Sequence, residues 1–160
     1  MDWLALLLKL AHIGLAMVLV GGLIGRGIVL ARAARSADIG HTVELLAAST
    51  PFEKMVVSSS MLVLPAGLLT AWAQGYPWLG LTTGWMLVSV VIYLAIIALV
   101  PTVFLPRGRR FDQVLDEAKA SGAVTDGLRA AFADPAVRAA HRAELLGISV
   151  VVALMVLKPF

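Results

Sequence analysis

The chain has 160 residues, of which 60% are hydrophobic and 14% charged, with a formal net charge of +3 and a mean hydropathy of +0.92. A soluble domain carries about 25% charged residues, so this apolar surface excludes a water-soluble globule and predicts a membrane protein. The absence of cysteine excludes disulfides, iron–sulfur clusters and thiolate zinc sites.

The first predicted span covers residues 3–31 and is longer than the roughly 30 Å hydrocarbon core requires. His12, Leu19 and Arg26 are spaced by seven and share one face of this helix. Glycines recur roughly opposite, at Gly14, Gly21 and Gly25. The last two form the small-residue spacing that lets helices approach closely. We therefore expect this helix to be central, with one glycine face and one polar face.

Residues 36–54 are predicted to form a polar connection with a short amphipathic helix that stops near Thr50, because the residue before Pro51 avoids the helical region. The second span covers 52–73, and Pro65 near its middle predicts a kink. A turn rich in glycine and proline follows. The third span covers 85–103 and is expected to end between Pro101 and Pro106.

Residues 107–138 contain two apolar repeats at helical spacing and are predicted to form two short amphipathic helices on the membrane surface. Asp134 and Pro135 are typical of an N-cap and a first helical position, and the fourth span covers 139–158. The predicted fold is an all-α, four-helix transmembrane bundle. It forms one integral membrane domain over residues 1–160, with a cytoplasmic helical excursion between helices 3 and 4.

The basic residues cluster at the ends of apolar runs, which indicates membrane topology and excludes a nucleic-acid surface. Eleven of the 13 lie in two regions, at Arg26, Arg32, Arg35, Lys54, Arg107, Arg109, Arg110, Lys119, Arg129, Arg138 and Arg142. The positive-inside rule therefore places both long connections in the cytoplasm and both termini outside. Four tryptophans are expected to form an aromatic belt at the outer interface: Trp3, Trp72, Trp78 and Trp85.

Glu144 lies about 20 Å of helix before Lys158, so a spanning helix must bring this carboxylate to the edge of the bilayer. Such a charge calls for a partner. The sequence predicts an ion pair between Arg26 and Glu144, or between Arg26 and Glu53, while a solvated charge at the head-group level is an equally good interpretation. The nearby His141, like His41, is interpreted as a surface residue.

A histidine inside an apolar span is a candidate for function. His12 has two interpretations: an axial ligand to haem iron or a proton relay, or a neutral histidine bonded to a serine or a backbone carbonyl of another helix. Met17 is too near in sequence to be a second ligand. Better candidates are Met61, Met155 or a residue of a partner subunit, although methionine in an apolar helix usually fills space. Tyr93 needs a hydrogen-bond partner and is a candidate to line a pocket with Ser89.

Several short motifs carry a family resemblance: Lys9-Leu-Ala-His12, Gly21-Gly22-Leu23, Arg26, Pro65-Ala-Gly67, Trp85 with Tyr93, and Met155 with Lys158-Pro159. With these motifs the chain resembles the bacterial family of predicted integral membrane proteins called domain of unknown function 2269, which implies the bacterial cytoplasmic (inner) membrane. The first span also resembles, more distantly, HemJ-type protoporphyrinogen oxidases and copper-resistance D proteins. The HemJ-type family binds haem b through a helix-1 histidine, which implies His12 here. That family also uses a lysine inside a later span, and predicted spans 2 and 3 contain none, which argues against oxidase activity.

Two classes of function therefore remain open. The first is a redox or haem-related membrane protein with haem b on His12. The second is a cofactor-free accessory or interaction subunit, in a homodimer or a membrane complex, where His12 and the glycines serve packing. A transport role ranks third. The proline kink predicted in the second span is compatible with transport but is not evidence for it.

Overall fold

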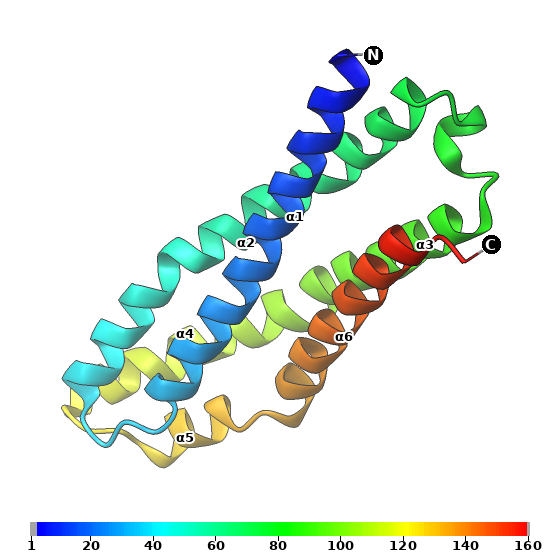
Figure 1. Ribbon diagram of the computed structural model, residues 1–160. Coiled ribbons are helices and arrows are strands. Elements are labelled where there is room, and N and C mark those ends of the chain that lie inside the picture. The colour runs from blue at the N-terminus through cyan, green and yellow to red at the C-terminus, as the bar shows by residue number, and fades with distance from the viewer. Residues whose placement is uncertain (1–2, 160) are drawn as a thin grey trace.

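The computed structural model describes residues 3–159, and every regular element in this range is a helix. The α-helices are α1 (Trp3–Ala33), α2 (Ile39–Ala73), α3 (Gly84–Leu99), α4 (Leu105–Ser121), α5 (Asp126–Phe132) and α6 (Pro135–Leu157) (Figure 1). Four helical stretches are long and apolar enough to cross a membrane: α1, α2, Gly84–Ser121 and Asp126–Leu157. The predicted all-α fold with four spans is therefore confirmed.

The helices associate as two close pairs. α1 packs along α2, and α3 packs along α6 (Figure 1). Both termini and the turn between α2 and α3 lie at one end of the molecule, here called the terminal end. The α1–α2 connection and α5 lie at the opposite end, here called the loop end (Figure 1).

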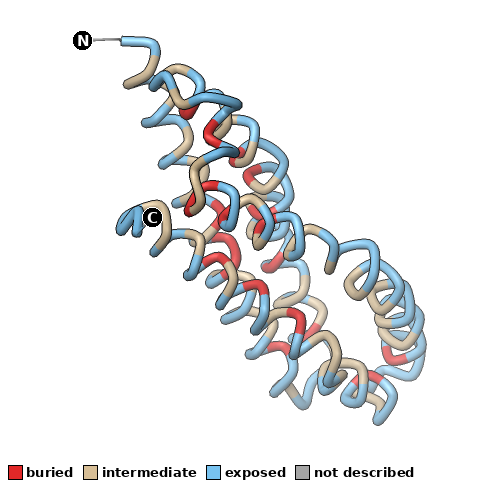
Figure 2. Tube along the Cα trace, turned by 90° about the vertical axis from the view of Figure 1, so that its right-hand side faces the viewer, coloured by how far each residue is buried: buried red, intermediate tan, exposed pale blue. Residues whose placement is uncertain are grey.

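The core that joins the two pairs is formed by one contiguous apolar cluster to which all four long helices contribute. Its buried members are Leu19 and Leu23 of α1, Val56 and Val63 of α2, Tyr93 of α3 and Ile148 of α6. Figure 2 shows the buried positions on the inward faces of the helices, with exposed positions around the outside. The apolar side chains on the outside face lipid in a membrane, where they carry no desolvation penalty.

The polar connection predicted at residues 36–54 is wrong. α2 begins at Ile39, where the side chain of Asp38 caps the helix, and it continues without interruption through Pro51 and Pro65. The preference of the residue before proline is a bias that packing along a long helix can override. Pro51 and Ala47, whose carbonyl loses its helical partner to that proline, are both exposed, so the cost of the missing bond is small.

The predicted end of the third span is also wrong, because the helix does not stop between Pro101 and Pro106. A π-helical turn (Val100–Phe104) carries the chain past Pro101 and leads directly into α4. A π turn accommodates an extra residue, and such turns are common at functional sites. Here the turn ends on Phe104, which contacts the charged group described below.

The two helices predicted between spans 3 and 4 are present as α4 and α5. They are held together by an edge-on contact of Phe111 with Phe132, whose ring centroids lie 5.0 Å apart. α4 ends at Gly122, which adopts a left-handed conformation with φ of 69°. The N-cap and first helical position predicted at Asp134 and Pro135 are confirmed, because Asp134 caps α6 and Pro135 is its first residue.

The glycine face of α1 differs from the prediction. Gly14 and Gly21 face open space, whereas Gly22 and Gly25 touch α2. A Cβ atom on Gly22 would lie 2.9 Å from a methyl carbon of Val56, and one on Gly25 would overlap the ring of Phe52. The contact that lets α1 and α2 approach is therefore made by glycines three residues apart, not four.

The aromatic belt is only partly as predicted, because Trp85 belongs to the core. Trp85 is 7% exposed and packs with Ala71 and Met86, and the Lys158 ammonium lies 5.6 Å from its ring centroid. The other three tryptophans are exposed at the terminal end, Trp78 most of all at 81%. Trp85 is turned inward because it starts α3 where the ends of α2 and α6 meet.

Candidate functional site

His12 is held against α2 rather than standing free in the bundle. Its Nδ1 lies 2.9 Å from the carbonyl oxygen of Val63, and since a carbonyl can only accept, the ring is protonated on Nδ1. The ring covers Gly67 so closely that a Cβ there would lie 2.8 Å from its Cε1. This is the second arrangement expected from the sequence, a histidine bonded to the backbone of another helix, and it leaves Nε2 with the lone pair.

Tyr93 makes a similar bond to the same helix. Its hydroxyl donates to the carbonyl oxygen of Ser60 at 2.5 Å, and the side chain is otherwise buried in the core. The carbonyls that accept from Tyr93 and His12 lie on either side of Met61, whose own carbonyl loses its helical partner to Pro65. Neighbouring helices commonly supply donors to the backbone around a membrane proline.

Met155 lies in a different environment from His12. It packs against the cluster of Ala71, Trp85 and Met86 near the terminal end. His12 and Met155 were predicted as possible haem ligands, and Tyr93 as a residue that lines a pocket beside the cofactor. The structure gives them separate partners, in α2 for His12 and Tyr93 and in the apolar cluster for Met155.

The structure brings Arg26 and Glu144 together across the bundle. Arg26 donates from Nη2 to Glu144 Oε2 at 2.7 Å, and the two side chains are only 15% and 10% exposed. Glu53, the alternative partner, instead accepts a 3.4 Å hydrogen bond from Ser49. This ion pair connects α1 to α6, the two spans that belong to different helix pairs.

Two further residues complete this group, and sequence reasoning missed both. His141 Nδ1 lies 3.3 Å from both Arg26 Nη2 and Glu144 Oε2, so it accepts from the arginine in one tautomer and donates to the glutamate in the other. Phe104 stacks on the His141 ring at 4.8 Å and lies 5.9 Å from the guanidinium carbon of Arg26. The three-residue spacing of His141 and Glu144 on one helix was the available signal, whereas nothing in the sequence pointed to Phe104.

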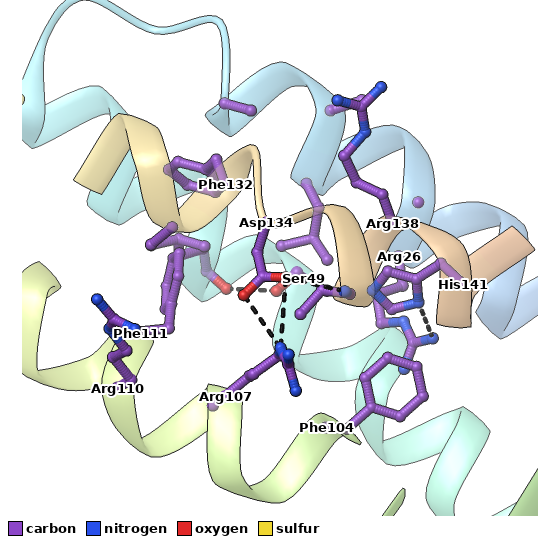
Figure 3. Close-up of a pocket in the computed structure, with 18 of the residues that line it drawn as sticks. Arg26, Ser49, Phe104, Arg107, Arg110, Phe111, Phe132, Asp134, Arg138 and His141 are labelled. Carbon is purple, nitrogen blue, oxygen red and sulfur yellow. Dashed lines mark hydrogen bonds and ion pairs between the residues drawn. The ribbon is translucent and has the colours of Figure 1, made fainter. Parts of the chain in front are cut away.

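This charged group forms part of the wall of a cavity of about 920 Å³ at the loop end, here called the loop-end cavity (Figure 3). Residues from α1, α2, α4, α5 and α6 line it, together with Phe104 from the π turn. A volume of this size lies within the range of small-molecule sites in proteins, about 300–1,000 Å³. The cavity lies where α4 and α5 face the loop-end portions of α1, α2 and α6.

A second ion pair stands across the loop-end cavity, where Arg107 points to Asp134 (Figure 3). Arg107 Nε lies 3.1 Å from Asp134 Oδ2, and Asp134 Oδ1 accepts from the backbone N–H groups of Ala136 and Val137. Asp134 precedes the predicted span 139–158. Desolvation by burial acts to raise the pKa of Asp134. The hydrogen bonds from the two N–H groups and the positive charge of Arg107 together outweigh this effect and hold the pKa below its usual value.

The cavity wall has more positive than negative side chains. Its charged residues are five arginines and four acids: Arg26, Arg107, Arg110, Arg138, Arg142, Glu53, Asp112, Asp134 and Glu144. Two arginines are held in the ion pairs above, while the other three make no ion pair with any acid in residues 3–159. Arg138 and Arg142 are exposed and four residues apart on α6, where like charges repel each other.

The side chains of the loop-end cavity are chemically suited to bind an anion. Within residues 3–159, no group of three or more histidine, cysteine, aspartate or glutamate side chains is arranged to hold a metal ion. Arginine pairs phosphate and carboxylate groups through two parallel N–H bonds, and the apolar and aromatic side chains of the loop-end cavity suit the remainder of an organic anion.

Comparison with known proteins gave one result. The family model described as a predicted integral membrane protein (DUF2269) matches residues 6–159. No curated protein and no solved structure matched the chain. The match covers almost all of the sequence and all four long helices. The chain therefore belongs to the DUF2269 family of predicted integral membrane proteins.

Proposed function

We propose that this four-span membrane protein binds an anionic ligand in the loop-end cavity. The observation that carries the proposal is the set of arginines on the cavity wall that pair with no acid in the described part of the chain, Arg110, Arg138 and Arg142. A protein gains nothing in stability from placing Arg138 one helical turn from Arg142, and an anion between them removes their repulsion. On the predicted topology this cavity opens to the cytoplasm.

The paired and the unpaired arginines of the cavity wall have different roles in this proposal. The Arg26–Glu144 pair and the Arg107–Asp134 pair are already neutralised, so they fix the cavity wall rather than attract the ligand. The exposed arginines on α6 are free to turn toward an anion, and Phe104, Phe111 and Phe132 supply apolar surface beside it. The ligand expected from this combination has a phosphate or carboxylate group and an apolar part.

A water-soluble phosphate monoester, glycerol 3-phosphate, tests the proposal in detergent. We expect it to raise the unfolding temperature in a saturable way, because a ligand at 100 times its dissociation constant adds about 2.7 kcal/mol to the free energy of unfolding. Sodium chloride at equal ionic strength should give no such rise. The effect should be lost in the double variant Arg138→Gln/Arg142→Gln.

The matched control is Arg109→Gln/Arg129→Gln, which removes the same charge from two exposed arginines that do not line the cavity. This control should keep the response to glycerol 3-phosphate. The proposal is wrong if the wild type does not respond, or if both double variants respond equally. Circular dichroism of each variant establishes that the helices are intact before the comparison is made.

Haem b on His12 is a second candidate, favoured by one observation. Metal-ligating histidines usually donate their other ring N–H to a backbone carbonyl, and His12 does so to Val63, which leaves Nε2 for an axial bond. His12 would therefore hold the haem iron through Nε2. Tyr93 and Met155 do not complete a ligand set with it, since the hydroxyl of Tyr93 donates to Ser60 and Met155 packs near the terminal end. When bound, haem would supply one-electron redox chemistry.

An absorption spectrum separates haem binding from a structural role of His12. Protein purified from haem-replete cells should show a Soret band that disappears in His12→Ala and persists in His41→Ala, since the exposed side chain of His41 pairs with Glu44 of its own helix. A colourless, fully stable wild-type protein would contradict the haem proposal. A protein that is colourless and also indifferent to anions would leave the role of a cofactor-free accessory subunit.

A further inference from the structure

A second hollow lies beside the loop-end cavity, between α1 and α6, and is here called the seam hollow. It measures about 290 Å³ and is lined by Val20, Leu23, Ile24, Leu145, Ile148, Ser149 and Val152. Ser149 is the one polar side chain among them, and its hydroxyl donates to the Leu145 carbonyl of its own helix at 2.8 Å. The lining therefore offers an apolar surface with no unsatisfied side-chain polar group.

The two spaces adjoin each other. Leu23 and Leu145 line both the loop-end cavity and the seam hollow. From these residues the seam hollow extends along α1 toward Val20 and along α6 toward Val152, which is away from the loop end and into the predicted span. The arginine-bearing cavity thus lies next to an apolar hollow, which on the predicted topology is at the depth of the hydrocarbon core.

The seam hollow follows from how the helices pair. α1 is close to α2 and α3 is close to α6, but the backbones of α1 and α6 do not approach as closely. Near the loop end the gap is bridged by the long side chains of Arg26 and Glu144. On the terminal-end side of that ion pair, the apolar side chains of α1 and α6 are shorter and do not fill the gap, which is the seam hollow.

We infer that the anion bound in the loop-end cavity is the head group of an anionic lipid, one hydrocarbon chain of which occupies the seam hollow. This inference rests on the proposed function and names its ligand class. A lipid chain that moves from the bilayer into the hollow leaves one apolar environment for another, so it gains little hydrophobic free energy. Selection must therefore come from the charge of the head group, and the chain fixes where the lipid sits.

Photoreactive lipids test this assignment in vesicles of phosphatidylcholine. A trace of phosphatidic acid with a diazirine in one acyl chain should label the hollow-lining segments 20–24 and 145–152. The same diazirine on phosphatidylcholine should label these segments about thirtyfold less, because Arg138 and Arg142 each contribute on the order of 1 kcal/mol to holding an anionic lipid, and about 1.4 kcal/mol corresponds to tenfold. Arg138→Gln/Arg142→Gln should reduce the phosphatidic acid labelling to the phosphatidylcholine level.

A matched pair of serine variants separates the chain site from the head-group site. Ser149→Trp fills the seam hollow, whereas Ser58→Trp adds the same bulk to another exposed helical serine, whose hydroxyl also bonds the carbonyl four residues earlier. Ser149→Trp should abolish labelling of the two segments and keep the stabilisation by glycerol 3-phosphate. Ser58→Trp should leave both unchanged.

The outcomes distinguish the two claims. Labelling spread evenly over the lipid-facing surface, with the response to glycerol 3-phosphate retained, overturns the lipid assignment and leaves a water-soluble anion as the ligand. Equal labelling by the two lipids in segments 20–24 and 145–152 also overturns it, because the head group then selects nothing. Loss of the glycerol 3-phosphate response in the wild type overturns the proposed function itself.

Discussion

Replacing Arg26 with leucine is expected to lower the free energy of unfolding by about 3–5 kcal/mol, the cost of leaving one partner of a buried ion pair behind. The charge left behind is that of Glu144, whose side chain is only 10% exposed. His141, at 3.3 Å, can donate one hydrogen bond to this carboxylate, which compensates for only part of the lost ion pair. Unfolding in mixed detergent micelles, followed by circular dichroism, gives the free energy.

The second change needed to interpret this result is Glu144→Gln in the Arg26→Leu background. It removes the unpaired charge and should restore part of the lost stability, so the two changes should be non-additive. Arg32→Leu is the matched control, because Arg32 is an exposed arginine on the same helix with no ion pair in the described residues. If Arg26→Leu and Glu144→Gln are each as silent as the control, the pair contributes nothing to stability.

The second large effect is expected at Gly22. Gly22→Leu should destabilise the protein by about 1–3 kcal/mol, the usual cost of overpacking, by forcing α1 away from α2. Its Cβ alone would lie 3.2 Å from the backbone oxygen of Phe52 and 2.9 Å from a methyl carbon of Val56. A backbone atom in a packed helix cannot move aside cheaply, so the helices must separate.

Gly21→Leu is the control for this prediction. Gly21 is the adjacent residue in the same helix, and a Cβ there meets nothing within 4 Å. The unfolding free energy of the Gly21→Leu variant should equal or exceed that of the wild type, because leucine has a higher helix propensity than glycine by up to about 1 kcal/mol. The opposite order of stabilities for the two variants would mean that α1 is rotated about its axis relative to α2.

The four spans could be predicted from the sequence because they depend on local properties. Runs of apolar residues long enough to cross a bilayer predict them directly, and Asp134 followed by Pro135 predicts the start of α6 because capping is a local interaction. The errors at Pro51 and Pro101 have one cause: proline weakens a helix locally, and tertiary packing decides whether the helix continues. The choice between Gly21 and Gly22 likewise depends on the rotation of α1, which the repeat alone does not determine.

The candidate site was predictable only in part. Arg26 and Glu144 could be paired because each is costly at its depth and both lie at the same membrane edge. The three-residue spacing places His141 beside Glu144 on one helix, but its contact with Arg26 and the position of Phe104 depend on tertiary contacts between α1, α6 and the π turn. The loop-end cavity is formed by segments more than 100 residues apart, so its arginines were interpreted from the sequence as topology signals alone.

The most direct test of anion binding is native mass spectrometry of the protein released from the membranes in which it was made. Wild type and Arg109→Gln/Arg129→Gln should retain an anionic molecule of discrete mass, and Arg138→Gln/Arg142→Gln should have lost it. Identical spectra for the two double variants, or a wild type that carries no anionic molecule, would contradict anion binding in the loop-end cavity.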